Sequence, residues 1–247
     1  MSDFAADLLI GEPVRCLFTH ECSEDSHKLA VQIGQGFAVN GIKLLVDDFR
    51  PGDRIATRIE TFDCEALVFL LSQASWSSHW CQEELRFADS VRIPVIAVRI
   101  EGDLPLELRE RLVISLPPAN TTDWEEILHF LAKAVESRGL LYRTISTLTR
   151  NLKPYDVRGI AQDLQDRFEP TILAEAVKDL LSVYFRSDDP NVRHWIAVAL
   201  HKAGTREAVS ALQDCFARED HPYPRYAIQR AFDELNLSAV GPNQEDK

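Results

Sequence analysis

Short apolar runs alternate with amphipathic stretches over the first 140 residues of the chain. Five of these runs have the length of strands, and they span residues 14–19, 42–46, 66–71, 94–100 and 111–116. The third run, ALVFLL, is apolar at every position, which is typical of a strand covered on both faces. Because parallel strands need crossover connections, strand–helix alternation of this kind predicts a parallel sheet covered by helices.

Helical periodicity fills the segments between the runs. After the first run, an apolar stripe at i, i+4 and i+8 follows Ser23 and Asp25, either of which can serve as the N-cap, and Gly41 ends the helix. The stripe consists of Leu29, Ile33 and Phe37. Further helices are expected over residues 55–62, 80–89 and 124–136. The turn-rich residues 47–53 and the Ser-rich stretch before residue 80 are expected to be loops.

From residue 140 onward the strand pattern stops and helical segments repeat. Residues 207–209 (EAV) repeat residues 175–177 at an offset of 32 positions. The same offset pairs Leu180 with Leu212, Tyr184 with Phe216, Arg186 with Arg218, Asp188 with Asp220, Pro190 with Pro222 and Arg193 with Arg225. Each unit reads as a helix, an acidic turn with proline and a second helix. Since one helical pair cannot bury its apolar face alone, the repeat predicts a stacked solenoid.

The repeated arginines allow two interpretations. We expect them to bond the carboxylates of neighbouring turns, and the alternative is a stripe that binds nucleic acid or a nucleotide. The arginines are Arg186, Arg193, Arg218 and Arg225, and the turn carboxylates are Asp188, Asp189 and Asp220.

Composition narrows the class of protein. The 247 residues carry 27 Lys and Arg against 39 Asp and Glu, a net charge of −12, which argues against a general nucleic-acid binder. No apolar run of about 18 residues occurs, so no membrane span is expected. The first residues lack the features of a signal peptide, and the five scattered cysteines are odd in number, so we expect reduced thiols, no metal site and a cytoplasmic location.

One segment carries candidate chemistry. In SWSSHWCQEEL (residues 75–85), Trp80 and Glu84 are four positions apart and share a face if the helix begins near residue 80. Ligands of parallel sheets bind at the carboxyl ends of strands, which here are expected at residues 19–21, 47–49 and 72–74. A carboxylate at Glu84 can therefore reach such a site. The alternative is a surface glutamate beside a tryptophan of the core.

Four boxes in order make the first 140 residues resemble a TIR (Toll/interleukin-1 receptor) domain. They are LFTHECSED at 17–25, DDFRPG at 47–52 in the manner of the BB loop, S-x-W-C-x-x-E-L at 78–85, and IPV at 93–95. The resemblance implies a flavodoxin-like α/β domain with a five-stranded parallel sheet and helices on both faces, assigned to residues 1–140. The family's usual Ser-Tyr after the first strand is Thr19-His20 here. Residues 23–28 also resemble SEFIR domains, but residues 80–85 favour TIR.

The remainder resembles HEAT-like repeats. DPNVR at 189–193 followed by IAVAL at 196–200 carries this resemblance, with a partial earlier copy from Asp156. We therefore expect an all-α HEAT-like repeat domain over residues 141–247.

The TIR resemblance implies an activity, since many bacterial, plant and some animal TIR domains cleave NAD⁺ at the nicotinamide–ribose bond. The catalytic glutamate of the family matches Glu84. The positions expected to contact substrate are Trp80, Thr19, His20, Asp47, Phe49, Arg50 and Gly52. NAD⁺ is then the substrate, with no further cofactor. By resemblance to bacterial effectors of anti-phage defence, TIR domains self-associate and the repeats receive an unknown activating signal. The alternative is a non-enzymatic adaptor that only mediates protein–protein interaction.

Overall fold

A computed structural model describes residues 12–21, 23–45, 64–109, 111–116, 124–149 and 154–235 of the chain. Contacts divide it into two compact units, of which the first is Glu12–Tyr142 and the second holds the described residues after it. The helix expected over residues 55–62 and the BB-type loop at 47–52 lie outside the described residues.

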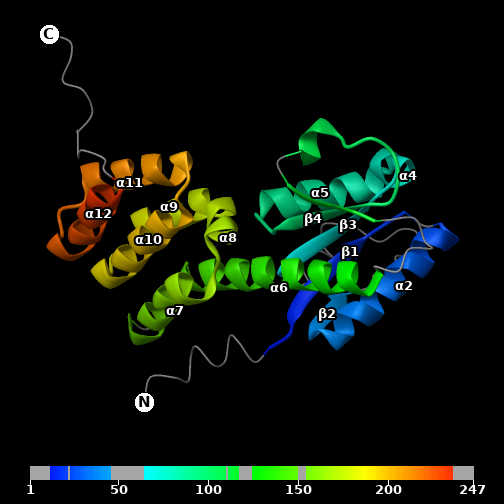
Figure 1. Ribbon diagram of the computed structural model, residues 1–247, viewed down its shortest axis with the longest axis horizontal. Coiled ribbons are helices and arrows are strands. Elements are labelled where there is room, and N and C mark those ends of the chain that lie inside the picture. Colours follow the sequence, from blue (N-terminus) through cyan, green and yellow to red (C-terminus); the bar gives the residue numbers. More distant parts are fainter. Residues whose placement is uncertain are drawn as a thin grey trace, which may run out of the picture. The chain divides into compact units, whose positions relative to one another are not determined.

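The first unit contains a five-stranded sheet in the order β2-β1-β3-β4-β5, and every neighbouring pair is parallel (Figure 1). The strands are β1 (Val14–Thr19), β2 (Ile42–Leu45), β3 (Ala66–Leu71), β4 (Val95–Arg99) and β5 (Leu112–Ser115). Strand β3 is buried at all six positions and lies in the middle of the sheet, as its continuously apolar sequence predicted. The flavodoxin-like fold expected from the sequence is therefore confirmed.

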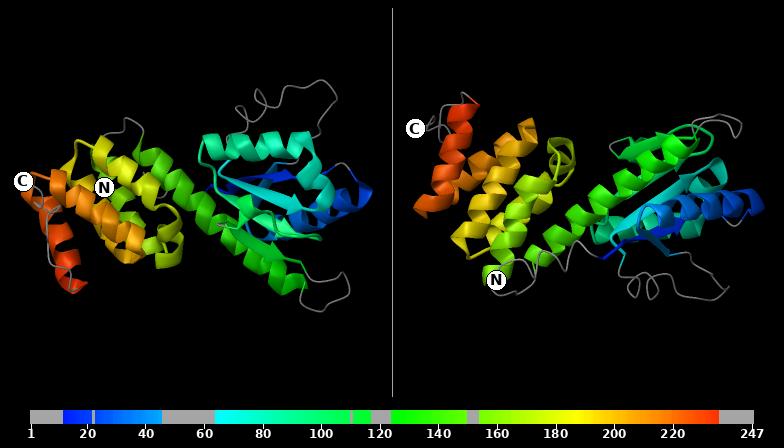
Figure 2. Two further views of the ribbon diagram at one scale, coloured as in Figure 1. Left: turned by 90° about the horizontal axis from the view of Figure 1, so that it is seen from above. Right: turned by 60° about the horizontal axis from the view of Figure 1, so that its bottom comes forward.

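Helices cover both faces of this sheet (Figures 1 and 2). On one face, α2 (Glu24–Val39) and α6 (Trp124–Leu148) pack against alternate residues of the strands, including Cys16, Phe18 and Val68. On the other face, α5 (His79–Ser90) packs against the intervening residues, including Leu17 and Phe69. The two-residue periodicity of the strands thus assigns each side chain to one of two cores.

Helix α2 begins and ends where its sequence predicted. Ser23, and not Asp25, is the N-cap, and its hydroxyl accepts a hydrogen bond from the amide of Ser26. Gly41 follows the C-cap with φ of +72°, a conformation that glycine adopts without the steric penalty of a side chain.

Two local predictions were wrong. The Ser-rich stretch is not a loop throughout, because Gln73–Ser77 form the short helix α4. The helix expected to end at residue 136 continues to Leu148. Gly139 does not end α6; instead it lets the helix approach β1, since a Cβ there would lie 2.4 Å from a methyl carbon of Val14. Close packing on the sheet outweighs the weak helix propensity of glycine.

The second unit is entirely helical where the structure describes it. Its helices are α7 (Pro154–Arg167), α8 (Pro170–Glu175), α9 (Val177–Arg186), α10 (Pro190–Ala203), α11 (Arg206–Arg218) and α12 (Pro222–Glu234). Four of them begin at proline, whose missing N–H is not needed in the first turn. Helix α9 packs on α11 and α10 packs on α12, so the two copies of the repeat stack. Helix α10 also contacts α7 and α8 and forms the centre of the unit.

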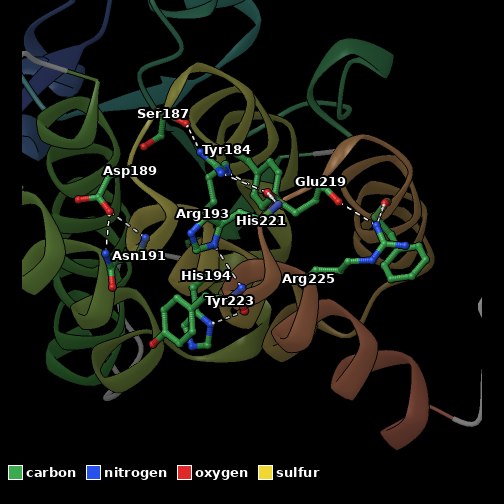
Figure 3. Close-up of polar contacts among 11 residues, drawn as sticks. Tyr184, Ser187, Asp189, Asn191, Arg193, His194, Glu219, His221, Tyr223 and Arg225 are labelled. Carbon is green, nitrogen blue, oxygen red and sulfur yellow. Dashed lines mark hydrogen bonds and ion pairs between the residues drawn. The ribbon is translucent and has the colours of Figure 1, made fainter.

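A buried carboxylate ties the two copies together (Figure 3). Glu219, which is 4% exposed, accepts hydrogen bonds from Arg193 at 2.8 and 3.1 Å and from the Tyr184 hydroxyl at 2.5 Å. The backbone amide of His221 donates a further bond at 2.9 Å. Both oxygens of Glu219 are thereby satisfied by groups from α9, α10 and the turn before α12.

The partners expected for the repeated arginines therefore need correction. Arg193 binds Glu219 rather than an aspartate. Arg225 donates to the backbone carbonyl of Glu219 at 2.8 Å and lies over the ring of Phe216, and Arg218 lies over the ring of Phe185. Arg193 and Arg218 join the two copies, whereas Arg225 contacts residues of its own copy. The charges of all three face a carboxylate, carbonyls or aromatic rings.

Candidate functional site

The order of the strands in the sheet reverses between β1 and β3, so the carboxyl ends of these two strands form the topological switch point. The chain places β2 on one side of β1 and β3 on the other, and the helices that follow β1 and β3 cover opposite faces. In doubly wound sheets of this order, ligands bind at this switch point. Thr19 ends β1 there, and Ser72 directly follows β3.

Glu84 lies on the buried face of α5. It is 4% exposed and shares that face with Cys81, Leu85 and Ala88, which are also buried. The other three residues belong to the core between α5 and the sheet. The charge of a buried carboxylate interacts strongly with a nearby cation, because the protein interior screens charges less than water does.

Trp80 does not anchor α5 in the core. Its side chain is 46% exposed, whereas Glu84 one turn later is buried. The prediction of a core tryptophan is therefore excluded. Trp80 thus presents aromatic surface to solvent one turn before a buried carboxylate.

Thr19 lies on the same side of the sheet as α5. It pairs with Phe69 in the parallel register, and paired residues of parallel strands face the same side. Thr19 is 1% exposed, and its hydroxyl has no hydrogen-bond partner in the described part of the structure. A buried hydroxyl without a partner is unfavourable by about 1–3 kcal/mol, so its presence at a switch point suggests a bound ligand or water.

His20 lies on the opposite side of the sheet from Thr19. Its ring is 6.0 Å from the ring of Phe18 and 5.9 Å from that of His27, on the face covered by α2. Its Nδ1 lies 2.5 Å from the backbone carbonyl of Glu21, a contact in which the ring must donate. The structure thus separates Thr19 from His20, which the sequence had grouped together.

Four predicted site residues cannot be placed in this geometry. Asp47, Phe49, Arg50 and Gly52 lie outside the described residues, and their expected contacts with substrate stay predictions.

Sequence reasoning missed the polar corner that leads into α5. Ser72 and Ser75 form a capping box, in which each side-chain oxygen accepts a bond from the other residue's backbone amide. Ser78 is both the C-cap of α4 and the N-cap of α5. The spacing of serines at 72, 75 and 78 was the available signal, since serine caps helices in preference to continuing them.

The fold and this edge define a doubly wound α/β domain of flavodoxin-like order. Residues 21–131 match the model of the TIR domain, and residues 145–233 match the model of HEAT repeats. The chain thus carries a TIR domain followed by HEAT repeats, as its motifs predicted. No curated protein and no solved structure matches the chain.

The described residues contain neither a metal-binding cluster nor a membrane-spanning helix. In the ranges given above, no group of three His, Cys, Asp or Glu residues is arranged to hold a metal ion. Nor does any helix within those ranges combine the length and apolar character needed to cross a membrane. TIR domains and HEAT repeats commonly mediate protein interactions and self-association.

Proposed function

We propose that the protein is an NAD⁺ glycohydrolase whose TIR domain cleaves the nicotinamide–ribose bond with Glu84 as the catalytic carboxylate. The observation that carries the proposal is the placement of two groups on one side of the sheet. Glu84 lies buried on α5, and the unpartnered Thr19 hydroxyl lies on the same side at the switch point. The TIR family match supports the reaction class.

The chemistry needs only one carboxylate. Glycosidases that expel neutral alcohols use a general acid together with a second carboxyl group. The nicotinamide of NAD⁺ is already cationic, so it departs as a neutral base without being protonated. The ribose carbon then develops positive charge, and water adds to it. One NAD⁺ and one water thus give nicotinamide, an ADP-ribose product and a proton.

Glu84 stabilises the cationic ribose by electrostatics. At an effective dielectric constant near 20, opposite unit charges 4 Å apart attract by about 4 kcal/mol. A carboxylate already fixed in a buried position needs little reorganisation as the ribose becomes cationic. The same oxygens can accept hydrogen bonds from ribose hydroxyls and receive the proton of the attacking water.

The remaining residues have graded roles. The Thr19 hydroxyl donates a hydrogen bond to the ribose, and the exposed Trp80 ring stacks on the nicotinamide or packs against the ribose. His20 lines the opposite side of the strand end. Asp47, Phe49, Arg50 and Gly52 are assigned to the site by resemblance to the BB loop. Because the chain has a net charge of −12, the anionic pyrophosphate needs local donors, for which Arg50 and backbone amides are the candidates.

The domain arrangement supports regulation by assembly. HEAT repeats would receive an activating partner or another copy of the chain, and association of TIR domains would complete the active site. The protein would then act as a defence effector that depletes NAD⁺.

The test is incubation of the full chain with NAD⁺ over a range of protein concentrations, beside Glu84→Gln. We expect NAD⁺ loss that rises faster than linearly with protein concentration, and no loss with Glu84→Gln although its circular dichroism is unchanged. Full turnover by Glu84→Gln would contradict the site. Absence of NAD⁺ loss at every concentration, including under crowding, would instead support the adaptor role.

A further inference from the structure

Gln82 closes the corner between α4 and α5. Its side-chain Nε2 donates a hydrogen bond to the backbone carbonyl of Trp76 at 2.9 Å. Trp76 lies in the last turn of α4, where carbonyls have no partner within their own helix. The bond therefore runs from the first turn of α5 back to the preceding helix, and it spans six residues of sequence.

Helix α4 is itself held firmly to the sheet. Its capping box with Ser72 and Ser75 uses buried side chains directly after β3, and Ser75 is fully buried. The ring of Trp76 meets the ring of Phe69 of β3 edge to face, with centroids 6.4 Å apart and planes at 75°. Trp76 is thus a fixed point on the sheet, and Gln82 links α5 to it.

The rotation of α5 about its axis decides where Glu84 points. Side chains of an α-helix are separated by about 100° per residue, so rotation or fraying of the first turns of α5 changes the direction in which Glu84 points. The N-cap hydrogen bond of α5 is long and therefore weak, because the amide nitrogen of Cys81 lies 3.5 Å from the Ser78 hydroxyl oxygen. Gln82 supplies a second restraint two residues before Glu84.

We propose that Gln82 is a positioning residue of the catalytic site, which holds the first turns of α5 so that the Glu84 carboxylate keeps its buried orientation. This inference rests on the proposed NAD⁺ hydrolysis. Gln82 occupies a variable position of the S-x-W-C-x-x-E-L box, and motif matching assigns it no role. Its contribution follows only from the bond to Trp76.

Three variants test the proposal in the full chain. Gln82→Met keeps the length of the side chain and removes the donor. Gln82→Lys keeps a donor of sufficient reach. Gln35→Met makes the same chemical change at an exposed position of α2 on the other face of the sheet. Two quantities are measured: kcat and KM for NAD⁺ normalised to folded protein, and hydrogen exchange of a peptide covering residues 73–90.

We expect Gln82→Met to lower kcat about tenfold with KM within twofold, because misplaced catalytic groups slow chemistry more than binding. Amide exchange over residues 73–90 should accelerate about tenfold, while peptides of β3 and α10 keep their rates. Gln82→Lys should recover at least half of the kcat, and Gln35→Met should match the wild type.

The kinetic and the exchange measurements distinguish failure of the positioning role from failure of the proposed NAD⁺ hydrolysis. A kcat within twofold of wild type for Gln82→Met, or unchanged exchange over residues 73–90, overturns the positioning role. If the wild type consumes no NAD⁺, the proposed function fails, and the exchange measurement alone then decides whether Gln82 holds α5: acceleration supports the restraint and unchanged exchange overturns it.

Discussion

Arg193 and Glu219 form a bidentate ion pair across the two copies of the helical repeat, with nitrogen–oxygen distances of 2.8 and 3.1 Å. The pair is buried on the carboxylate side, where Glu219 is 4% exposed, and it links α10 to the turn before α12. Tyr184 of α9 donates to the same carboxylate, so three elements of the solenoid meet at one charge. Burial and the bond to Glu219 raise the pKa of the Tyr184 hydroxyl.

Glu219→Gln should destabilise the protein by about 2–3 kcal/mol. The amide presents one oxygen and one NH₂ where Arg193 and Tyr184 need acceptors, so the partly buried guanidinium of Arg193 loses part of its compensation. Urea unfolding followed by circular dichroism measures the change. The control is Glu207→Gln, whose contact with Lys178 spans 3.8 Å between exposed side chains and should contribute under about 0.5 kcal/mol. Equal losses of stability in the two variants would contradict a stabilising role for the bonds from Arg193 and Tyr184 to Glu219.

The contribution of Glu219 to the free energy of unfolding should decrease as the pH falls. Burial, the largest single influence, raises the pKa of the carboxyl, but the bonds from Arg193, Tyr184 and the His221 amide together outweigh it and hold the pKa below its ordinary value of 4.5. A lowered folded-state pKa stabilises the protein above pH 4.5, and this stability is lost as pH falls through the folded-state pKa.

The unfolding free energies of wild type and Glu219→Gln, measured from pH 7 to pH 3, check that sign. We expect their difference to be constant above pH 5 and to shrink below pH 4.5, because a protonated carboxyl resembles the amide. Asp189 also has a lowered pKa, in which burial is outweighed by bonds from Asn191 and Arg158, but it titrates equally in both proteins and cancels. A difference that grows toward low pH would contradict the assignment.

Thr19→Val should raise stability while it lowers activity. The hydroxyl is buried and unpartnered in the described structure, so replacing it by a methyl group of similar size should add about 1 kcal/mol to the free energy of unfolding. On the proposed function, the same change removes a donor to the ribose, and kcat/KM for NAD⁺ should fall about tenfold. Thr19→Ser keeps the hydroxyl and should retain most activity. A less stable Thr19→Val protein would show that the hydroxyl has a partner.

Gly139→Ala should destabilise the TIR domain in spite of the better helix propensity of alanine. The propensity gain is about 1 kcal/mol. However, the added Cβ would lie 2.4 Å from a methyl carbon of Val14, which is 3% exposed and cannot easily move. We expect a net loss of about 1–2 kcal/mol. Thermal unfolding of a double-mutant cycle with Val14→Ala checks the cause, since the smaller partner should remove most of the penalty.

Much of the TIR domain follows from local pattern. The bounds of β1 and β3 are those of their apolar runs, because buried strands of a parallel sheet admit few polar residues. Ser23 and Gly41 delimit α2 through capping chemistry that acts within a few residues. Prediction failed at α6, which passes Gly139 because the helix packs closely on the distant Val14 of β1. It also failed at α4, although the capping box of Ser72 and Ser75 that begins this helix is a local contact.

The residues of the candidate site could also be identified from the sequence only in part. Glu84 and Trp80 were identified from their spacing on a helix and from the TIR-like box, but periodicity alone did not indicate that Trp80 is exposed while Glu84 is buried. Thr19 and His20 are adjacent in sequence, and adjacent residues at a strand end face opposite sides of a sheet. Only the register with β3 assigns Thr19 to the side of α5.

By itself, the sequence determined the two families of structure in this chain, the five strands of the sheet, and the carboxylate on which the proposed chemistry depends. Those features rest on periodicity, capping and motif spacing, which act over a few residues. Tertiary structure alone decided that Arg193 pairs with Glu219, that Gln82 reaches Trp76, and that Thr19 and Glu84 share one side of the sheet. These pairings join side chains across turns, helices and strands, where packing in three dimensions sets the distance.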